Sequence, residues 1–343
     1  MGQRKFRNMD EFAKASGISR PTLSKYFNDP ESVRQSTRQR IEKALKQYDY
    51  RPNFYAMNQN RRTTKSIGIV VPNLADPFFN EISRAIELAC VEAGYNPIVL
   101  SSHGRTHRER ENLEALKSLR PAGVLLAPFG RESDEAYIRN YGKDVPLVLF
   151  DADVVNGGEA FVGIDNYQTI DLIVKYLFRS GEPPCFFEME TPSNPNANKR
   201  HQAFVEAMDR IGHPTHIFKA KGEGWDFEEI GKSEGGRMLA ESAFPTNTIL
   251  CSNDRLAIGL LSAAYQQGIR VGHGPECSLR IAGHDDHPFS RFTCPSLTTI
   301  AQDYTAIAET AVATLFKAIE SEQRSNERSI TLFGGSLVMR DSA

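Results

Sequence analysis

The stretch that decides the N-terminal part of the fold is residues 9–28, which read MDEFAKASGISRPTLSKYFN. Apolar residues recur at helical spacing on both sides of a short turn at Gly17, where glycine tolerates the left-handed backbone. Asn8 precedes the first apolar stripe and Ser19 the second, both as predicted helix N-caps. A third stripe follows, with Ser36 as its predicted N-cap. The pattern predicts an all-α helix-turn-helix head with a third, supporting helix.

Charge is divided unevenly along the chain. Residues 1–65 hold 15 Lys and Arg against 6 Asp and Glu, a net charge of +9, whereas the remainder carries −11. A basic segment on an acidic body favours a polyanion as partner of that segment alone. A second helix capped by Ser19, with Pro21 in its first turn, fits the major groove of double-stranded DNA. The alternative, a helical bundle that binds another protein, does not explain the positive charge.

The same residues resemble a known family. The matching motifs are residues 9–28, VRQSTR at 33–38 and YRPN at 50–53, and they resemble the LacI/GalR transcriptional regulators. The likeness continues over essentially the whole chain. It implies the following DNA-binding residues: Ser19, Arg20, Pro21, Thr22, Ser24, Lys25, Asn28, Asn53, Gln59 and Arg61.

Two of these positions depart from the family pattern. The family places a base-contacting residue at Pro21, but proline has no side-chain hydrogen bond to offer, so its contact would be apolar. Residues 51–65 match the hinge segment, which in the family folds as a helix in the minor groove of bound DNA. Gln59 stands where the family usually has a leucine wedge, so hydrogen bonding by Gln59 is a possible substitute for wedge-driven kinking.

From residue 66 the pattern changes to strands that alternate with helical segments. Residues 66–72, SIGIVVP, form a continuous apolar run, which is typical of a parallel strand covered on both faces. Further strand candidates are residues 97–100, 123–127, 145–150, 161–164, 185–189, 216–219, 248–251 and 279–283. The succession predicts a doubly wound parallel α/β architecture that is long enough for two lobes.

The resemblance implies a periplasmic-binding-protein-like core with two lobes, three crossovers and a ligand cleft. The expected domains are a head at 1–50, a hinge linker at 51–65, an N-lobe at 66–168 and 301–329, and a C-lobe at 169–300 and 330–343. The strand pattern at 330–338 is expected to end the chain in the C-lobe. The lobe boundaries are what the resemblance implies.

Polar and aromatic side chains follow several predicted strands. In open α/β sheets, ligands bind beyond the carboxyl ends of the strands. Carboxylates, amides, one arginine and the only tryptophan suit a hydroxyl-rich ligand, because the polar groups bond hydroxyls and an aromatic face covers a sugar ring. By resemblance, the effector-binding residues are Phe79, Asp151, Asn194, Asn196, Arg200, Trp225, Asn253 and Asp285.

Structural roles are the alternatives at these positions. Phe79 and Trp225 could be packing residues, and Arg200 could be a structural ion-pair partner. Asp254 precedes a helical segment and is predicted to be its N-cap rather than an effector contact. Asp285 and Asp151 are the positions on which the prediction of an effector site mainly depends.

The sequence gives little support for a catalytic, metal-binding or cofactor-binding site. The GKSEG string at 231–235 matches a serine-hydrolase motif, but an acidic, helix-like segment precedes it instead of the required strand. The HDDH string at 284–287 has no further ligands placed by sequence, so no metal is expected. No glycine-rich dinucleotide or Walker motif occurs, so no cofactor is expected. No catalytic residues are assigned.

Five scattered cysteines, no apolar N-terminal signal region and no long apolar run favour a cytoplasmic protein. We expect a ligand-responsive transcriptional regulator, a repressor, that binds a near-palindromic operator as a homodimer. A sugar is the expected effector, with a nucleobase or a sugar phosphate as alternatives. A plain ligand-binding protein and a sugar-modifying enzyme are the alternatives from other classes.

Overall fold

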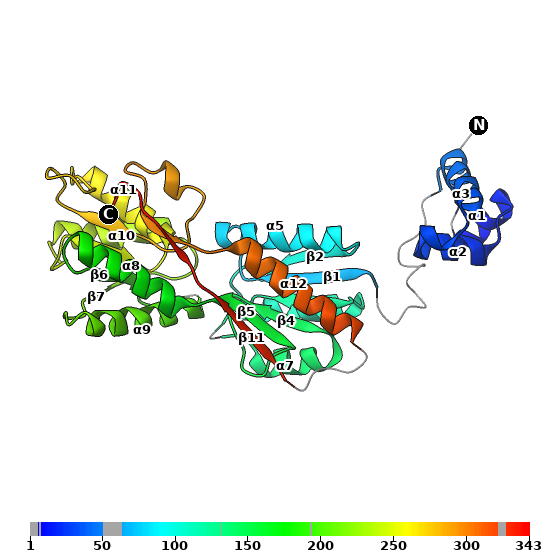
Figure 1. The fold of residues 1–343 in the computed structure, drawn as a ribbon, viewed down its shortest axis with the longest axis horizontal. Helices are drawn as coiled ribbons and strands as arrows, with labels where there is room; N and C mark the ends of the chain where they lie inside the picture. Colours follow the sequence, from blue (N-terminus) through cyan, green and yellow to red (C-terminus); the bar gives the residue numbers. More distant parts are fainter. Residues whose placement is uncertain (1–5, 7, 51–63, 131, 193, 322–326) are drawn as a thin grey trace. The chain divides into compact units, whose positions relative to one another are not determined.

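The structure, a computed structural model, describes residues 6, 8–50, 64–130, 132–192, 194–321 and 327–343. The chain divides into two compact units, residues 1–64 and residues 65–343 (Figure 1). The first unit is helical and the second is an α/β core, as the sequence predicted. Each unit has its own hydrophobic core.

In its described residues, the head has three α-helices around a small core. Phe12, Leu23 and Ile41 are fully buried in it, one from each helix, and the Phe12 ring stacks on Tyr50 with centroids 4.3 Å apart. The helices are α1 (Met9–Ser16), α2 (Arg20–Asn28) and α3 (Gln35–Tyr48), with a 3-10 turn at Pro30–Ser32.

Local capping explains where these helices begin. The side chains of Asn8 and Ser19 accept hydrogen bonds from the first turns of α1 and α2, and Gly17 between them has φ of 65°. The predicted N-cap of the third helix is wrong. The helix begins one residue before Ser36, and its N-cap is Arg34, whose carbonyl accepts from the Arg38 N–H. Ser36 lies inside the first turn.

The N-lobe of the core is a six-stranded parallel sheet in the order β11-β5-β4-β3-β1-β2. Helices α5 and α12 cover one face, and α6 and α7 cover the other. The strands are β1 (Ser66–Val71), β2 (Asn96–Ser101), β3 (Gly123–Leu126), β4 (Leu147–Phe150), β5 (Ala160–Ile164) and β11 (Ser329–Phe333). The helices are α5 (Pro77–Glu92), α6 (Thr106–Ser118), α7 (Glu135–Asp144) and α12 (Tyr304–Glu320).

The apolar run at the start of the core is explained by this layering. All six residues of β1 are buried. Ile67, Ile69 and Val71 pack under α5 and α12, and Val70 packs under α6 and α7 on the opposite face. A strand covered on both sides has no exposed face, so its sequence shows no polar alternation.

The C-lobe repeats the arrangement with a four-stranded parallel sheet in the order β7-β6-β8-β9. Helices α8 and α9 pack on one face, and α10 and α11 on the other. The strands are β6 (Cys185–Met189), β7 (Ile217–Ala220), β8 (Thr248–Cys251) and β9 (Arg280–Ala282). The helices are α8 (Asn166–Ser180), α9 (Pro195–Arg210), α10 (Phe227–Ala240) and α11 (Asp254–Gln266).

The chain passes between the lobes three times, after β5, after β10 (Thr299–Ala301) and after β11 (Figure 1). The predicted C-lobe segment 330–343 is wrong at its beginning, because β11 pairs with β5 in the N-lobe sheet. A separate strand, β12 (Ser336–Val338), then pairs with β10 in the antiparallel sense. Gly335 lies at the crossing, where a Cβ atom would stand 2.6 Å from the Thr169 side chain.

Candidate functional site

Helix α2 of the head presents the predicted DNA-binding side chains. Arg20, Pro21 and Lys25 are exposed, while Thr22 and Ser24 are partly buried. The apolar face of the helix packs into the head core through Leu23, so the polar face is directed outward. This arrangement leaves the basic side chains of the helix accessible to a partner.

The first turn of α2 is held by its cap. The Ser19 hydroxyl accepts from the Thr22 N–H at 3.3 Å and shares a 2.7 Å hydrogen bond with the Thr22 hydroxyl. Arg20 forms an exposed ion pair with Asp10, with 3.3 Å between Nε and Oδ1. Asn28 is the last residue of the helix. The remaining predicted DNA-binding residues, Asn53, Gln59 and Arg61, lie outside the described residues.

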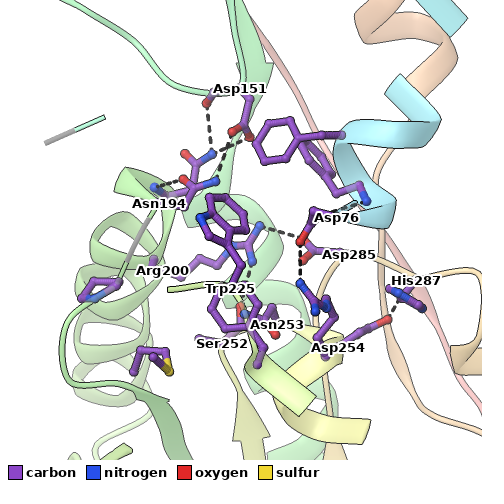
Figure 2. A pocket seen from close by; sticks show the side chains of 18 of the residues that line it. Asp76, Asp151, Asn194, Arg200, Trp225, Ser252, Asn253, Asp254, Asp285 and His287 are labelled. Atoms are coloured by element: carbon purple, nitrogen blue, oxygen red, sulfur yellow. Dashed lines mark hydrogen bonds and ion pairs between the residues drawn. The ribbon is translucent and has the colours of Figure 1, made fainter. Parts of the chain in front are cut away.

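The core contains a cavity between its lobes, with a volume of about 70 Å³. All eight predicted effector residues line it, although they are spread from Phe79 to Asp285 in the sequence (Figure 2). The N-lobe supplies the first turn of α5 and the residue after β4. The C-lobe supplies the N-termini of α9 and α11 and the loop after β9. Strand ends and helix starts therefore meet here, as expected for an α/β ligand site.

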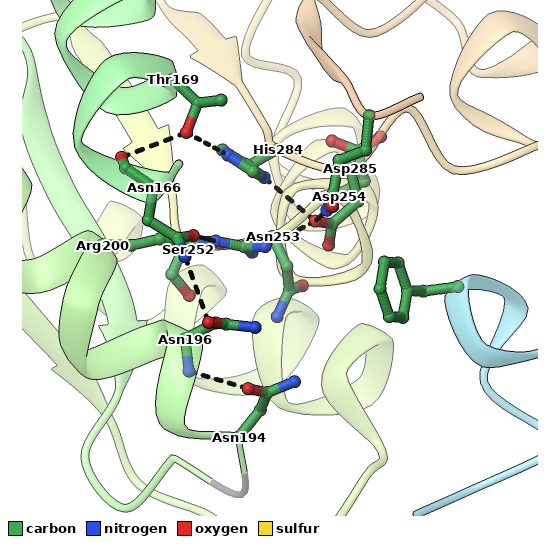
Figure 3. Close-up of polar contacts among 12 residues, drawn as sticks. Asn166, Thr169, Asn194, Asn196, Arg200, Ser252, Asn253, Asp254, His284 and Asp285 are labelled. Carbon is green, nitrogen blue, oxygen red and sulfur yellow. Dashed lines mark hydrogen bonds and ion pairs between the residues drawn. The ribbon is translucent and has the colours of Figure 1, made fainter. Parts of the chain in front are cut away.

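Arg200 on α9 organises the C-lobe side of the cavity (Figure 3). Its Nε donates to Asn166 Oδ1 at 3.1 Å, one terminal nitrogen donates to the Ser252 carbonyl at 2.7 Å, and the other donates to Asp285 Oδ1 at 2.7 Å. The side chain is only 9% exposed. Arg200 is therefore a structural ion-pair partner, because its guanidinium positions Asp285 and the loop after β8.

Asp285 receives all of its side-chain hydrogen bonds on one oxygen. Oδ1 accepts from Arg200, from His284 Nδ1 at 3.0 Å and from Gln302 Nε2 at 2.8 Å. Within the described part of the chain, Oδ2 has no bonding partner. Burial alone would raise the pKa of Asp285, but Arg200 and His284 outweigh it and hold the pKa below its usual value. Asp285 thus presents an ionised acceptor oxygen to the cavity.

His284 is buried and neutral. Burial, reinforced by the positive charge of Arg200, lowers the pKa of His284 to about 4. Its two ring nitrogens contact Asp285 and the Thr169 hydroxyl, each at 3.0 Å. Within the HDDH string, His284 therefore orients Asp285.

Asp151 bonds across the cavity to the other lobe. It follows β4 with φ of 61°, and its Oδ1 and carbonyl both accept from Asn196 Nδ2, at 2.7 and 3.0 Å. Asn194 Nδ2 donates to Oδ2 at 3.1 Å. Burial raises the pKa of Asp151 to about 7, against the opposing effects of Asn194 and Arg200. The two asparagines begin α9, where Asn194 is also the N-cap.

Aromatic rings form the remaining wall. Phe79 is 1% exposed and belongs to the N-lobe core, and its ring meets Trp225 edge-on at 5.8 Å. Trp225 also packs edge-on against Phe227 of α10 at 5.8 Å. Phe79 and Trp225 are therefore both packing residues and cavity-lining residues.

The start of α11 corrects one prediction. Asn253, not Asp254, is the N-cap, since its side chain accepts from the Leu256 N–H at 2.8 Å. Asp254 is fully buried and accepts from Ser290, Thr299 and the His287 backbone. Burial and the nearby Asp285 charge raise the pKa of Asp254 to about 7.

Among the cavity-lining residues that the sequence prediction did not include, Asp76 and Arg255 form an ion pair between the lobes. Arg255 on α11 donates to Asp76, the N-cap of α5, with 3.0 Å between Nη1 and Oδ2. Asp76 lies shortly after the first predicted strand, but its partner is 179 residues away. No local pattern marks Arg255, because the packing of the two lobes alone directs it toward Asp76.

Comparison with known proteins identifies families that match both the head and the core. The family model described as bacterial regulatory proteins, lacI family, matches residues 8–53, and a periplasmic binding protein-like domain matches residues 178–343. The chain belongs to the lacI family. It is a DNA-binding transcriptional regulator with a helix-turn-helix head and a core of two lobes.

The relatives cover nearly the whole chain. The HTH-type transcriptional repressor PurR of Pasteurella multocida is 29% identical over 335 residues, which is 97% of each chain. The repressor CytR of Escherichia coli K12 is 29% identical over 92% of this lacI-family chain and 90% of its own length. A lac repressor dimer bound to operator and the anti-inducer ONPF is 22% identical, with a TM-score of 0.84 over 98% of this chain and 99% of its own. It shares the fold.

In the part of the chain that the structure describes, no helix has the length and apolar character needed to cross a membrane.

Proposed function

We propose that this protein is a repressor that binds operator DNA as a homodimer and is controlled by a small neutral molecule with several hydroxyl groups, a sugar. The proposed domains are the head to residue 50, the hinge at 51–65 and two core lobes, with β11 assigned to the N-lobe. The observation that carries the effector class is the pairing of both cavity guanidinium groups with carboxylates of the protein.

The DNA-binding part of the proposal rests on the exposed polar face of α2. Ser19, Arg20 and Thr22 lie at its N-terminal end, which is the end that reaches base edges when such a helix enters the major groove. Lys25 lies one turn further along. The lac repressor dimer on its operator supports the same mode for this chain, with two heads on two half-sites.

The effector part rests on which cavity groups are already bonded. Arg200 is bonded to Asn166, Ser252 and Asp285, and Arg255 is bonded to Asp76 and Glu228. Neither charge is free for a phosphate or a carboxylate. An anionic effector would also meet Asp285 and the other acidic side chains at close range.

The unbonded groups favour hydroxyls. Asp285 Oδ2 accepts, and the amide nitrogen of Asn253 donates, since the Asn253 oxygen is used as the helix cap. Such alternating acceptors and donors match the hydroxyls of a sugar, and Trp225 supplies a flat face for its ring. Because the similar proteins PurR and CytR are repressors, we assign the cavity to binding and not to catalysis, without a metal or cofactor. We place the protein in the cytoplasm with its DNA.

The single tryptophan makes the test direct, because Trp225 lines the cavity. Its fluorescence should change with saturation when the full-length protein is titrated with a neutral monosaccharide or sugar alcohol from a panel. A matched sugar phosphate should give no saturable change. Saturation only by sugar phosphates, or only by nucleobases or nucleosides, would overturn the proposed effector class. Operator binding is tested separately, by selection of bound duplexes from a random pool.

A further inference from the structure

An ionic cluster joins the two lobes at one flank of the cavity, apart from the hydrogen-bond network of Asp285. Arg255 projects from the first turn of α11 in the C-lobe, and Asp76 caps α5 in the N-lobe. Arg255 Nη1 donates to Asp76 Oδ2 at 3.0 Å, while Nε and Nη2 donate to Glu228 at 2.7 and 2.6 Å. One guanidinium therefore holds a carboxylate of each lobe (Figure 2 shows Asp76 at this flank).

Both partners of the bond between the lobes are fixed before they meet. Glu228 takes two nitrogens of Arg255 in a fork, and the guanidinium lies 5.1 Å from the centre of the Phe227 ring. On the other side, Asp76 Oδ1 accepts from the Phe78 N–H at 3.0 Å, which leaves Oδ2 directed at Arg255. Little side-chain freedom is lost when such preorganised groups pair.

Burial shields this bond from water, unlike an exposed ion pair. The side chains of Asp76 and Arg255 are 8% and 16% exposed, whereas both members of the Lys117–Asp144 pair, within the N-lobe, are at least half exposed. Water screens an exposed pair and replaces its partners, but parting Asp76 from Arg255 first requires the lobes to separate. The pair therefore resists that separation.

The opposite flank is joined by hydrogen bonds between side-chain amides and a carboxyl group. There Asn194 and Asn196 donate to Asp151 across the lobes. Between the flanks, Trp225 of the C-lobe packs against the N-lobe so closely that a Cβ atom on Gly104 would lie 2.6 Å from the indole nitrogen. Separation of the lobes must expose this tryptophan.

We infer that Asp76, Arg255 and Glu228 form a latch, in which the protein's own charges hold the lobes together and set how easily the cavity opens. Arg255 acts here as a positioning residue. The latch does not depend on the identity of the effector, and only its effect on effector binding rests on the proposed function. If the latch is weakened, the closed form of the cavity is less populated, so a ligand that requires the closed form binds less tightly.

Acrylamide quenching of Trp225 fluorescence tests the latch in the full-length protein with no DNA or effector. The variants are Asp76→Asn, which keeps a good helix cap but removes the charge, Arg255→Gln, and the two combined. Each single variant should raise the quenching constant roughly twofold or more. The double variant should match the singles, because all three remove the same bond.

The matched control is the exposed pair, changed by Lys117→Gln and Asp144→Asn, which should leave quenching at the wild-type value. Hydrogen exchange supplies a second readout at residues 194–198, on the far flank, where the latch variants should exchange faster. Unchanged quenching and exchange in folded latch variants would overturn the latch. So would an equal effect in the control pair, or a double variant whose effect is the product of the two single effects. None of these results depends on the proposed effector or operator.

Discussion

The head and the cavity both present polar groups to a binding partner, but they do so in opposite ways. In the head, Arg20 and Lys25 project from one helix into water, and their removal leaves the core around Phe12 intact. In the cavity, Arg200 is buried and Asp285 is partly buried, and they are bonded to each other and to several neighbours. Recognition and stability are therefore separate in the head and combined in the cavity.

The physical reason is solvation. An exposed cation keeps its hydration until phosphate replaces it, so it needs no protein partner. A buried charge has lost its hydration and is tolerated only when it is paired and hydrogen-bonded. Substitutions should accordingly change binding alone in the head, but stability first in the cavity.

The largest expected effect comes from Arg200→Met, which leaves the ionised Asp285 without its main partner. The free energy of unfolding of the full-length protein should fall by about 3–5 kcal/mol, as for other broken buried ion pairs. Urea unfolding followed by circular dichroism measures it. Arg237→Met, on the exposed face of α10, is the control and should cost no more than about 1 kcal/mol. An equal loss of unfolding free energy in the two variants would contradict the difference between buried and exposed ion pairs.

The next effect is a pH dependence located at Asp151. Because its pKa is raised to about 7, the folded protein holds a proton that the unfolded chain has released above about pH 4. The stability from this proton is complete below about pH 4 and is lost as the pH rises through about 7. In Asp151→Asn this contribution is absent.

Urea unfolding of wild type and Asp151→Asn at several pH values isolates the effect, since Asp254 and His284 titrate in both proteins. The difference in unfolding free energy, wild type minus variant, should fall with rising pH by at most about 1.4 kcal/mol per pH unit. A difference that stays constant or rises with pH would show that Asp151 is ionised throughout.

In the head, Lys25→Ala should weaken operator binding by about 1–3 kcal/mol and leave the unfolding free energy of the core unchanged. Fluorescence anisotropy with the selected duplex measures the affinity. Lys14→Ala, on exposed α1, removes the same charge and should weaken binding much less. A loss of core stability in Lys25→Ala would break the separation of binding from stability.

The smallest effect is expected for Asp10→Asn, which removes the exposed partner of Arg20. The unfolding free energy of the head should change by less than about 0.5 kcal/mol, because exposed ion pairs contribute little. Operator binding should strengthen slightly, as Arg20 is released and a negative charge is lost. Weaker binding would indicate that Asp10 orients Arg20 for DNA.

Features with a local cause could be predicted from the sequence. Asn8, Gly17 and Ser19 specify the turn and the first two helices through contacts within a few residues, so the head was predicted nearly in full. The nine strands predicted between residues 66 and 283 are present, and those buried on both faces, such as β1, β3 and β4, are marked by continuous apolar runs. The eight proposed effector residues share one cavity because parallel strands end at the same edge.

Features that depend on residues far apart in the chain could not be predicted from the sequence. The split between β11 and β12, and the assignment of β11 to the N-lobe, follow from pairing with β5 far back in the chain. The sequence determined the two units, their layers and the gathering of polar groups between the lobes. Only the tertiary structure decided that Arg200 is bound to Asp285 and Arg255 to Asp76, because the partner of a buried charge is whichever group the packing brings within reach.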